Sequence, residues 1–413
     1  MVSRLRVGTT DADIIADEYA SLTHKSFGHS TATIQSTEIK FKPSDGAAFD
    51  YFGYERSAAI GSGRIVVGSI YDDDNGSASG SAYIFDLEGN QIAKITASDA
   101  AGGDQFGRSV AAGSGRILVG APYNDDNGSS SGEVYFYNQD GDQVLARRAS
   151  DAAASDIFGY SVAIGCNRAV VGAPGNDDVA SSTGSAYIFD LDGNEITKLT
   201  ASDPILGDEF GYHCAIGNGR IVVGAPFSDG AGTSSGSAYI FDLEGNQIAK
   251  ITASDTQAGD LFGFHVSVGS GRIVVGAPQE DFKGSNAGAA YIFDLNGNEI
   301  TKITASDGAV SDAFGHAVSV GNGKIVVGAQ FDDDDGGSSG SIYIFDLDGT
   351  QIAKITASDA AAGDQFGRAV AIGSGRVITT AWLDDDNGDS SGSGYIYKLP
   401  QNYDIHFERT LGY

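Results

Sequence analysis

Cysteine, proline and long apolar runs are all scarce in this sequence. The two cysteines, Cys166 and Cys214, are too few for a framework of repeated disulfides, so we expect free and mostly buried thiols. No stretch of about 18 or more apolar residues occurs, so we expect no membrane-spanning segment. Arg4 and Arg6 are not followed by an apolar run, so we expect no secretory signal peptide.

Positive charge is scarce as well. Lys and Arg total 25 against 55 Asp and Glu, and the net charge is −30. Such a surface repels nucleic acid and anionic lipid, so we expect neither a nucleic-acid partner nor membrane insertion. It attracts divalent cations and also favours solubility, and the composition leaves both explanations open. The 59 glycines and only 7 prolines favour short strands and tight turns over long helices.

A Phe-Gly pair returns at a nearly constant spacing. The first gap between the phenylalanines is 54 residues and every later gap is 52. The seven copies start at Phe52, Phe106, Phe158, Phe210, Phe262, Phe314 and Phe366. Repeats of about fifty residues are typical of a propeller or another array in which each unit shares its core with its neighbours.

Each unit contains four predicted strands, joined by a glycine-rich hairpin, a polar loop and a second hairpin. Examples are residues 160–164, 220–226, 81–86 and 91–96. The second and third strands are apolar on consecutive residues, so both of their faces are expected to be covered. The sequence therefore predicts an all-β fold: a seven-bladed β-propeller of four-stranded antiparallel blades with a short N-terminal extension.

The two ends of the chain supply one strand too many for a closed ring. Residues 38–45 align with the fourth strand and link that precede every other Phe-Gly pair, and residues 404–408 form a candidate fourth strand for the last blade. We expect residues 39–42 to pair beside blade seven as the closure strand, while closure by the C-terminal strand stays open. The propeller domain is thus predicted to span residues 38–413.

Residues 1–37 lie outside the repeat and form a separate predicted segment. Residues 10–13 have the pattern of a helix N-terminus, and Ile15, Tyr19 and Leu22 would share one face of that helix. A frayed terminus is the alternative. We favour a docking arm that binds a protein partner in a virion or in self-assembly, because a disordered tail rarely carries a capped apolar stripe.

The repeat resembles the FG-GAP family, in which Phe-Gly is followed about sixteen residues later by Gly-Ala-Pro. That triplet stands at 120–122, 172–174, 224–226 and 276–278, while Gly68, Gly328 and Thr380 begin divergent triplets in the other blades. The resemblance covers residues 38–413. It implies a propeller like the head of the integrin α-chain, used for adhesion. Some members bind Ca²⁺ in Asp-x-Asp-x-Asp-Gly loops, and catalysis is not a general trait of the family, although phospholipase-like members exist.

Alternation of strand direction predicts where the acidic residues gather. The two hairpins of each unit emerge on one face, here called the hairpin face, together with the arginines that open the second strands. The polar loop and the link to the next unit emerge on the other, here called the loop face. Three aspartates recur there in every unit: one in the loop (Asp73, Asp125, Asp177, Asp229, Asp281, Asp333, Asp385), one ending Ala-Ser-Asp or its equivalent (Asp45, Asp99, Asp151, Asp203, Asp255, Asp307, Asp359), and one two residues before Phe (Asp50, Asp104, Asp156, Asp208, Asp260, Asp312, Asp364).

The polar loops of blades one, two, six and seven are candidate Ca²⁺ sites, because Ca²⁺ takes six to eight oxygen ligands from carboxylates, amides and carbonyls. The candidate ligands are Asp72, Asp73, Asp74, Asn75, Asp125, Asp126, Asn127, Asp332, Asp333, Asp334, Asp384, Asp385, Asp386 and Asn387. The alternative is that acids in turns bind backbone amides. We favour that structural interpretation for the other two recurrent aspartates, and the loop spacing itself departs from the family's calcium motif.

The sequence contains no recognisable catalytic constellation. His213 and His265 share one position in neighbouring blades, but two ligands are too few for a metal site, and core histidines are expected. No serine stands in a strand-to-helix elbow, and no glycine-rich loop precedes a helix. We therefore expect no catalytic or cofactor-binding residues and no enzyme activity.

These observations favour a non-enzymatic structural or binding propeller. Our first hypothesis is a virion surface component, a phage tail or fibre protein, that mediates host attachment or assembly, because it accounts for both the missing signal and the arm. A secreted or cell-surface calcium-binding adhesin is the alternative, with a receptor or glycan as its ligand. A propeller hydrolase or lyase and an intracellular scaffold are further alternatives.

Overall fold

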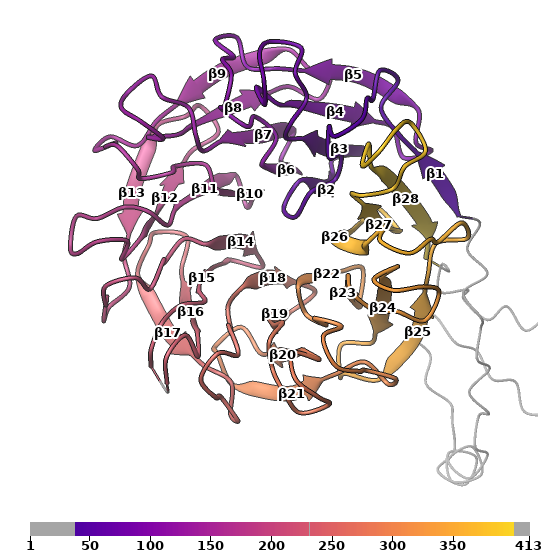
Figure 1. Ribbon diagram of the computed structural model, residues 1–413. Coiled ribbons are helices and arrows are strands. Elements are labelled where there is room, and N and C mark those ends of the chain that lie inside the picture. Colours follow the sequence, from indigo (N-terminus) through magenta and orange to yellow (C-terminus); the bar gives the residue numbers. More distant parts are fainter. Residues whose placement is uncertain (1–37, 231, 400–413) are drawn as a thin grey trace, which may run out of the picture. The chain divides into compact units, whose positions relative to one another are not determined.

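The computed structural model describes residues 38–230 and 232–399, and all regular structure in this part is β-strand (Figure 1). The strands form seven four-stranded antiparallel sheets, arranged as blades around a central axis. The predicted seven-bladed propeller is therefore confirmed. The part of the chain described here contains no helix that could cross a membrane. The docking arm at 1–37 and the candidate strand at 404–408 lie outside the described residues and stay predictions.

The first six blades each take four consecutive strands, numbered from the axis outward. Blade one comprises β2 (Ala58–Gly61), β3 (Arg64–Ser69), β4 (Ser81–Phe85) and β5 (Gln91–Ile95). Blade two comprises β6 (Ser109–Gly113), β7 (Arg116–Ala121), β8 (Glu133–Tyr137) and β9 (Gln143–Arg147). Blade three comprises β10 (Ser161–Gly165), β11 (Arg168–Ala173), β12 (Ser185–Phe189) and β13 (Glu195–Leu199).

The same order continues around the ring. Blade four comprises β14 (His213–Gly217), β15 (Arg220–Ala225), β16 (Ser237–Phe241) and β17 (Gln247–Ile251). Blade five comprises β18 (His265–Gly269), β19 (Arg272–Ala277), β20 (Ala289–Phe293) and β21 (Glu299–Ile303). Blade six comprises β22 (Ala317–Gly321), β23 (Lys324–Ala329), β24 (Ser341–Phe345) and β25 (Gln351–Ile355).

The second and third strands of each blade are buried on both faces, as their consecutive apolar residues predict. In β15 the residues after Arg220 are all buried, and every residue of β16 is buried. The core lies between blades: Phe262 of blade five packs with Ile240 of blade four and with Tyr291 of its own blade. Because each cluster is shared by two blades, no blade buries its apolar surface alone.

The Phe-Gly and Gly-Ala-Pro elements meet at the junction between neighbouring blades. The ring of Phe262 is fully buried and lies edge-on to Tyr291, with the ring centroids 5.5 Å apart. A Cβ atom on Gly224 of blade four would lie 2.0 Å from the carbonyl oxygen of Gly263 in blade five. Glycine is therefore required where the second strand of one blade touches the Phe-Gly turn of the next.

Blade seven closes the ring with a strand from the other end of the propeller domain. It comprises β26 (Phe366–Gly373), β27 (Arg376–Ala381), β28 (Ser393–Lys398) and, outermost, β1 (Ile39–Phe41). The β1–β28 pairing is antiparallel, with Ile39 opposite Ile396 and Phe41 opposite Gly394. The predicted N-terminal closure strand is thus confirmed, and its place is the fourth strand of blade seven.

The two faces of the disc carry the predicted connections. Both hairpins of a blade emerge on one face, where Arg220 Nε donates to the carbonyl oxygen of Leu295 in the next blade at 2.9 Å. The polar loops and the links emerge on the other. Cys166 and Cys214 are both free, as expected, but only Cys214 is buried. Cys166 is exposed, which corrects our prediction, because it occupies the turn of the β10–β11 hairpin.

Candidate functional site

The acids of each polar loop fall into three structural roles. The first is buried beneath the loop, as Asp72 is. The second binds the backbone of its own loop, since Asp73 Oδ1 accepts a hydrogen bond from the Ala78 N–H at 2.7 Å, and Asp125 and Asp385 accept equivalent bonds. The third, Asp74 and its equivalents, is exposed. The middle aspartates therefore shape the loops, as acids in turns commonly do.

In every blade a basic side chain on the fourth strand, or directly after it, lies beside at least one acid of the loop face. Lys354 Nζ is 2.9 Å from Asp307 Oδ2, 2.9 Å from Asp332 Oδ2 and 2.5 Å from Asp334 Oδ2. Burial would lower the pKa of Lys354, but its hydrogen bonds to the three aspartates raise it, so the amine stays charged. The lysines at the same position in the other blades are Lys40, Lys94, Lys198, Lys250 and Lys302, and in blade two Arg148, one residue after β9, has this role.

The predicted metal ligands are therefore brought together in pairs around a protein cation. Asp72 and Asp74 meet at Lys94, Asp332 and Asp334 meet at Lys354, and Asp384 and Asp386 meet at Lys40. The Asn127 side chain faces elsewhere and donates to the Ala152 carbonyl, while the backbone N–H groups of Asn75 and Asn387 donate to loop serines. Asp333 is exposed.

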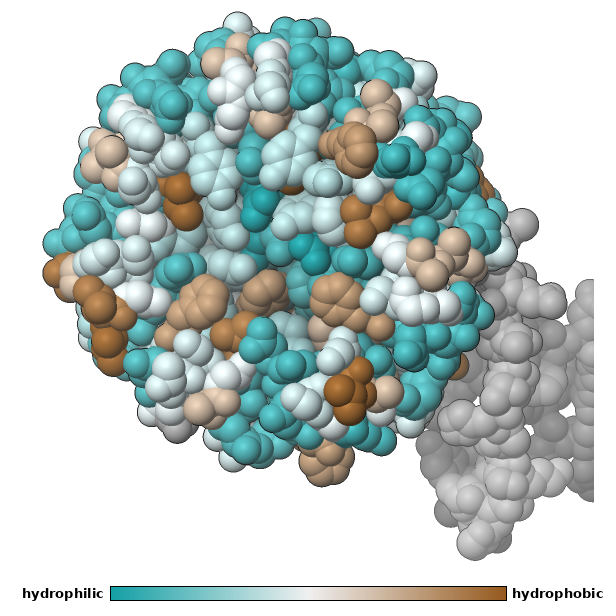
Figure 2. Space-filling view, in the orientation of Figure 1, coloured by the Kyte–Doolittle hydropathy of each residue, from teal (hydrophilic) through white to brown (hydrophobic). Residues whose placement is uncertain are grey.

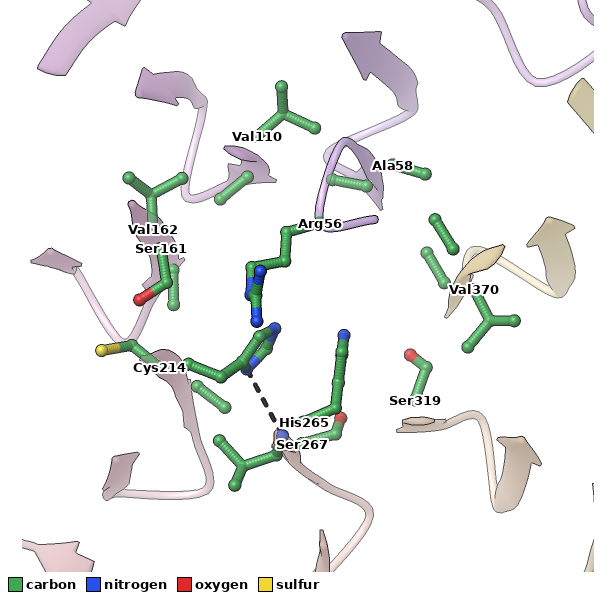
Figure 3. Close-up of a pocket in the computed structure, with 18 of the residues that line it drawn as sticks. Arg56, Ala58, Val110, Ser161, Val162, Cys214, His265, Ser267, Ser319 and Val370 are labelled. Atoms are coloured by element: carbon green, nitrogen blue, oxygen red, sulfur yellow. Dashed lines mark hydrogen bonds between the residues drawn. The ribbon is translucent and has the colours of Figure 1, made fainter. Parts of the chain in front are cut away.

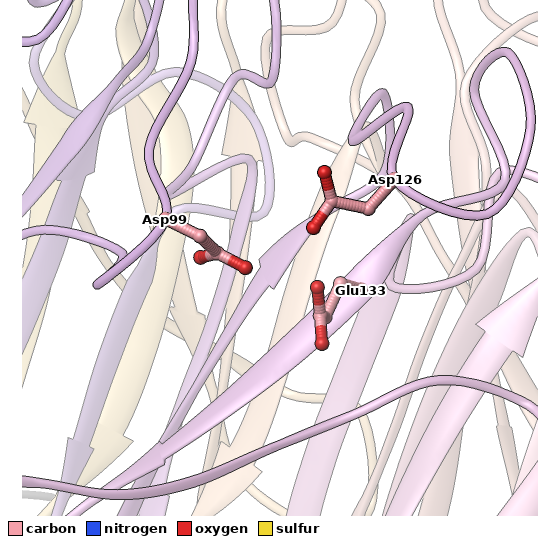
Figure 4. A group of neighbouring side chains, drawn as sticks. All are labelled: Asp99, Asp126 and Glu133. Carbon is pink, nitrogen blue, oxygen red and sulfur yellow. The ribbon is translucent and has the colours of Figure 1, made fainter.

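Blade two builds the same arrangement with arginine. Arg148 Nη2 lies 2.7 Å from Asp126 Oδ2 and 2.8 Å from Glu133 Oε2. Figure 4 shows the Asp99, Asp126 and Glu133 carboxylates turned toward one another, and their oxygens lie close enough to share a cation. The donor set suits a hard cation, but a guanidinium already neutralises part of it. Calcium binding at the four loops stays a prediction.

The other recurrent aspartates have structural roles, as we favoured. Asp364 Oδ2 accepts a hydrogen bond from the Ala361 N–H at 2.8 Å, and the same bond recurs two residues before every Phe-Gly pair. Burial raises the pKa of Asp364 to about 6. The aspartate of Ala-Ser-Asp instead joins blades: Asp307 Oδ1 accepts from the Tyr343 hydroxyl of the next blade at 2.9 Å. That partner differs from the backbone amide we expected.

The axis of the disc carries a second concentration of charge, which the sequence analysis missed. One position, five residues before the glycine of the first hairpin, points inward in each blade. Its occupants are Arg56, Arg108, Tyr160, Tyr212, Phe264, His316 and Arg368. The first spacing between Phe-Gly pairs is 54 residues instead of 52 because Tyr54 and Glu55 are inserted directly before Arg56, so the longer spacing marks the same place in the sequence. The longer first spacing and the variable residue at this position were the two features of the sequence that could have indicated a charged cluster at the axis.

Glu55 lies at the centre of this ring and binds several basic side chains. Its Oε2 is 2.9 Å from Arg56 Nη1 and 3.3 Å from Arg108 Nη2, and its Oε1 is 3.2 Å from Arg368 Nη2 and 4.0 Å from His316 Nε2. Burial would raise the pKa of Glu55, but the surrounding cations lower it to about 2. One carboxylate thus faces three guanidinium groups, which narrow one end of the axial channel.

Aromatic rings hold these guanidinium groups. Arg56 Cζ lies 4.3 Å from the centre of the Tyr212 ring and 4.9 Å from that of Tyr160, on the far side of the axis. Arg368 Cζ lies 5.2 Å from the ring centre of Trp382. Cations over aromatic faces are stabilised by the ring quadrupole, and more so when water is excluded.

Below this cluster the first strands enclose a cavity of about 200 Å³ along the axis. Figure 3 shows the Arg56 side chain extending into the middle of this channel, with His265 on the opposite wall. His213 and His265 stack with ring centroids 3.7 Å apart. The Nδ1 atom of each accepts a backbone N–H bond from the next blade, at Val266 and Val318 respectively.

Large apolar side chains are exposed on the loop face, most strongly at two places in blades whose loops lack the acidic run, while Phe49 (55 % exposed) and Phe331 (37 %) stand elsewhere on it. The Leu206 patch comprises Val179 (59 % exposed), Ile205 and Leu206 (68 %). The Phe282 patch comprises Phe282 (72 % exposed) and Val310 (63 %). Figure 2 shows one face of the disc, on which brown residues stand in small groups among hydrophilic ones around a central hollow.

This fold and these repeated contacts define a seven-bladed β-propeller whose blades are joined at Phe-Gly turns. The FG-GAP repeat model matches seven times, at residues 36–85, 90–137, 148–189, 194–241, 246–293, 298–345 and 350–397. The chain therefore belongs to the FG-GAP repeat family. No curated protein matches it.

Proposed function

We propose that this protein is a non-enzymatic binding propeller that attaches to a partner protein through the loop face. The exposed apolar side chains of the Leu206 and Phe282 patches carry this proposal. Apolar groups that stand out from a polar surface are typical of protein interaction sites. The recurrent aspartates support the proposal indirectly. Their contacts with lysines, tyrosines and backbone amides stabilise the ring, which leaves the exposed apolar side chains as the candidate binding surface.

The surroundings of the patches indicate the chemistry of the partner. Exposed aspartates flank both patches, among them Asp177 and Asp281, and the net charge of the chain is −30. A complementary partner presents apolar side chains in a pocket surrounded by Lys and Arg, which would also accelerate its encounter with the disc. We propose a virion surface as the setting, with the disc as a tail or fibre component that mediates attachment. A secreted or cell-surface adhesin is the alternative.

Binding of purified protein to particle and envelope fractions tests both parts of this proposal. We would compare the wild type with L206S/F282S/V310S, using immobilised virus particles and washed envelopes from the source. The control is I92S/I248S/I352S, which removes the same number of partly exposed aliphatic side chains (40–42 % exposed) from β5, β17 and β25. We expect the loop-face variant to bind about tenfold more weakly or worse and the control to bind normally.

Equal binding by the two variants would contradict the loop-face proposal. Peptide mass spectrometry on the same fractions distinguishes the settings. Enrichment in particles at fixed stoichiometry supports the virion hypothesis, whereas enrichment in envelopes or medium supports the adhesin.

A further inference from the structure

The axial channel holds more positive charge than its own residues neutralise. Arg56, Arg108 and Arg368 converge there on a single carboxylate, that of Glu55. Arg56 and Arg368 are 6 % and 8 % exposed, and the side chain of Arg108 is 11 % exposed. A net positive cluster is unexpected inside a chain of net charge −30, and uncompensated buried charge is costly. This imbalance points to an anionic ligand.

We propose that the axial channel binds a small oxyanion, a phosphate or a carboxylate, through Arg56, His213 and His265. Arg56 supplies the charge. Its Nη1 atom donates to Glu55 and its guanidinium also interacts with Tyr212, while the buried Nε and Nη2 atoms have no acceptor at hydrogen-bond geometry in the described part of the chain. Buried donors in native proteins are nearly always satisfied, so these two N–H groups identify the position that a ligand oxygen fills.

The histidines are arranged as donors toward the same cavity. Each Nδ1 atom accepts a backbone N–H bond, from Val266 for His213 and from Val318 for His265. Burial lowers the pKa of both imidazoles, that of His265 to about 3, so both are neutral at physiological pH. A neutral imidazole that accepts at Nδ1 carries its proton on Nε2. Each ring therefore offers one Nε2–H donor to a bound anion.

Serine hydroxyls extend this donor set along the channel wall. Ser267 Oγ accepts the Val320 N–H and Ser319 Oγ accepts the Ile372 N–H, both at 3.1 Å. Each hydroxyl hydrogen is thus left to donate. Among the described residues that line the cavity, Glu55 is the one acid, and it already accepts from the three arginines. A metal cation in this cavity would be repelled by the positive charge of Arg56, whereas an oxyanion would be surrounded by hydrogen-bond donors.

The size and opening of the cavity restrict the ligand. The free volume is about 200 Å³, which suits a small ion rather than a drug-sized molecule. The lining includes the half-buried Ile60, Ile164 and Ile216, which directly precede the first hairpins of their blades. A small anion can therefore enter from the hairpin face, while the Glu55 cluster narrows the other end. This site is separate from the apolar patches of the loop face.

Isothermal titration calorimetry on the full chain tests this proposal. Sodium phosphate and sodium malonate would be titrated separately into protein held at constant ionic strength with sodium chloride. We expect saturable binding of one stoichiometric anion, weakened roughly tenfold or more in R56Q, because hydrogen bonds to a charged group are lost. R64Q is the matched control: it removes an arginine on the hairpin face that binds Asp140, and its affinity should equal that of the wild type.

A second variant keeps the test decisive if R56Q fails to fold. H265L keeps roughly the size of the imidazole but removes its Nε2–H donor, so it should bind the same anion more weakly than the wild type. Saturable binding of phosphate or of malonate supports the site and identifies the class. Absence of saturable heat for both anions, or undiminished affinity in both R56Q and H265L, overturns it.

Discussion

At the residue scale, Lys354 illustrates how the acidic loops are neutralised from within. Its amino group contacts Asp307, Asp332 and Asp334, and its side chain is 18 % exposed while that of Asp332 is 4 % exposed. Asp332 also accepts a hydrogen bond from the Tyr343 hydroxyl. Removal of the amine leaves a buried carboxylate without its counter-ion, which costs more than the ion pair itself contributes.

Substitution of this lysine tests both the ion cluster and the calcium hypothesis. We expect K354M to lower the free energy of unfolding by about 3 kcal/mol, because Asp332 loses its charge partner. Calcium should restore part of that loss, since three carboxylates then converge without a protein cation. Urea unfolding with calcium or with a chelator measures both effects.

K398M provides the control, because Lys398 is exposed at the end of β28. If K354M and K398M unfold alike, the ammonium does not stabilise the loop. For the wild type, the calcium hypothesis predicts a higher melting temperature with calcium than with a chelator. Identical melting curves under the two conditions would reject calcium binding.

At the scale of the element, β1 joins two blades that are farthest apart in the chain. Phe41 is buried and its ring lies 4.7 Å from that of Phe85 in blade one, between centroids. Glu38 Oε2 accepts a hydrogen bond from the Tyr397 hydroxyl at 2.7 Å. This short N-terminal segment therefore holds blade seven together through its pairing and hydrogen bonds with β28, and it connects blade seven to blade one through the packing of Phe41.

Two truncations separate the closure strand from the segment before it. We expect deletion of residues 1–37 to leave the melting temperature unchanged and, if the segment is a docking arm, to abolish particle incorporation. Deletion of residues 1–42 should lower the free energy of unfolding by about 4 kcal/mol or more, because the Phe41 contacts and the β28 pairing are lost. Circular dichroism melting measures both. Equal stability of the two truncations would contradict closure by β1.

The repeated elements could be predicted from the sequence, whereas their exceptions could not. The constant spacing of Phe262 and its equivalents, together with the apolar runs, predicted the blades, because each copy of these residues is buried in the same way between two blades. The lysines of the fourth strands also recur, yet a pattern does not show that Lys354 lies among aspartates from the loop and from the preceding link. Glu55 and Arg56 were harder still, because seven blades meet at the axis and no local pattern records contacts across it.

At the scale of the whole molecule, two sets of acids respond to pH in opposite directions. Burial raises the pKa of the seven aspartates that precede Phe-Gly, to about 6 for Asp50, Asp312 and Asp364. These groups bind protons more tightly in the folded chain, so their contribution to stability grows as pH falls through about 6. Glu55, with its pKa of about 2, contributes stability above the unfolded value that is lost at low pH.

We therefore expect the melting temperature to rise by a few degrees from about pH 7.5 to about pH 5, and to fall below about pH 3.5. The rise between about pH 7.5 and pH 5, the upper limb of the profile, follows from protonation of the seven buried carboxyls. The fall at low pH, the lower limb, follows from protonation of Glu55 and the lysine-bound aspartates. Differential scanning calorimetry over this range measures the profile. A melting temperature that declines steadily from neutral pH to pH 5 would contradict it.

D364N assigns the upper limb to a specific group. The amide oxygen that replaces the carboxylate can still accept the Ala361 N–H, but it carries no charge, so the variant should be about 1 kcal/mol more stable than the wild type near pH 7.5 and equal to it near pH 4.5. D335N, at an exposed loop position, is the control and should follow the wild type throughout. Parallel profiles for D364N and the wild type would exclude Asp364 as the source.

The outermost strand of blade seven also determines how the disc would respond to mechanical load. Every other blade has its fourth strand joined to its third by a hairpin, whereas β1 is held to β28 by three residue pairs and side-chain contacts alone. Tension applied through the chain ahead of β1 therefore enters the disc where β1 and β28 pair without a connecting hairpin. Under force, β1 should peel from β28 before any blade unravels, so the ring would open at a defined point and reclose when the tension is released.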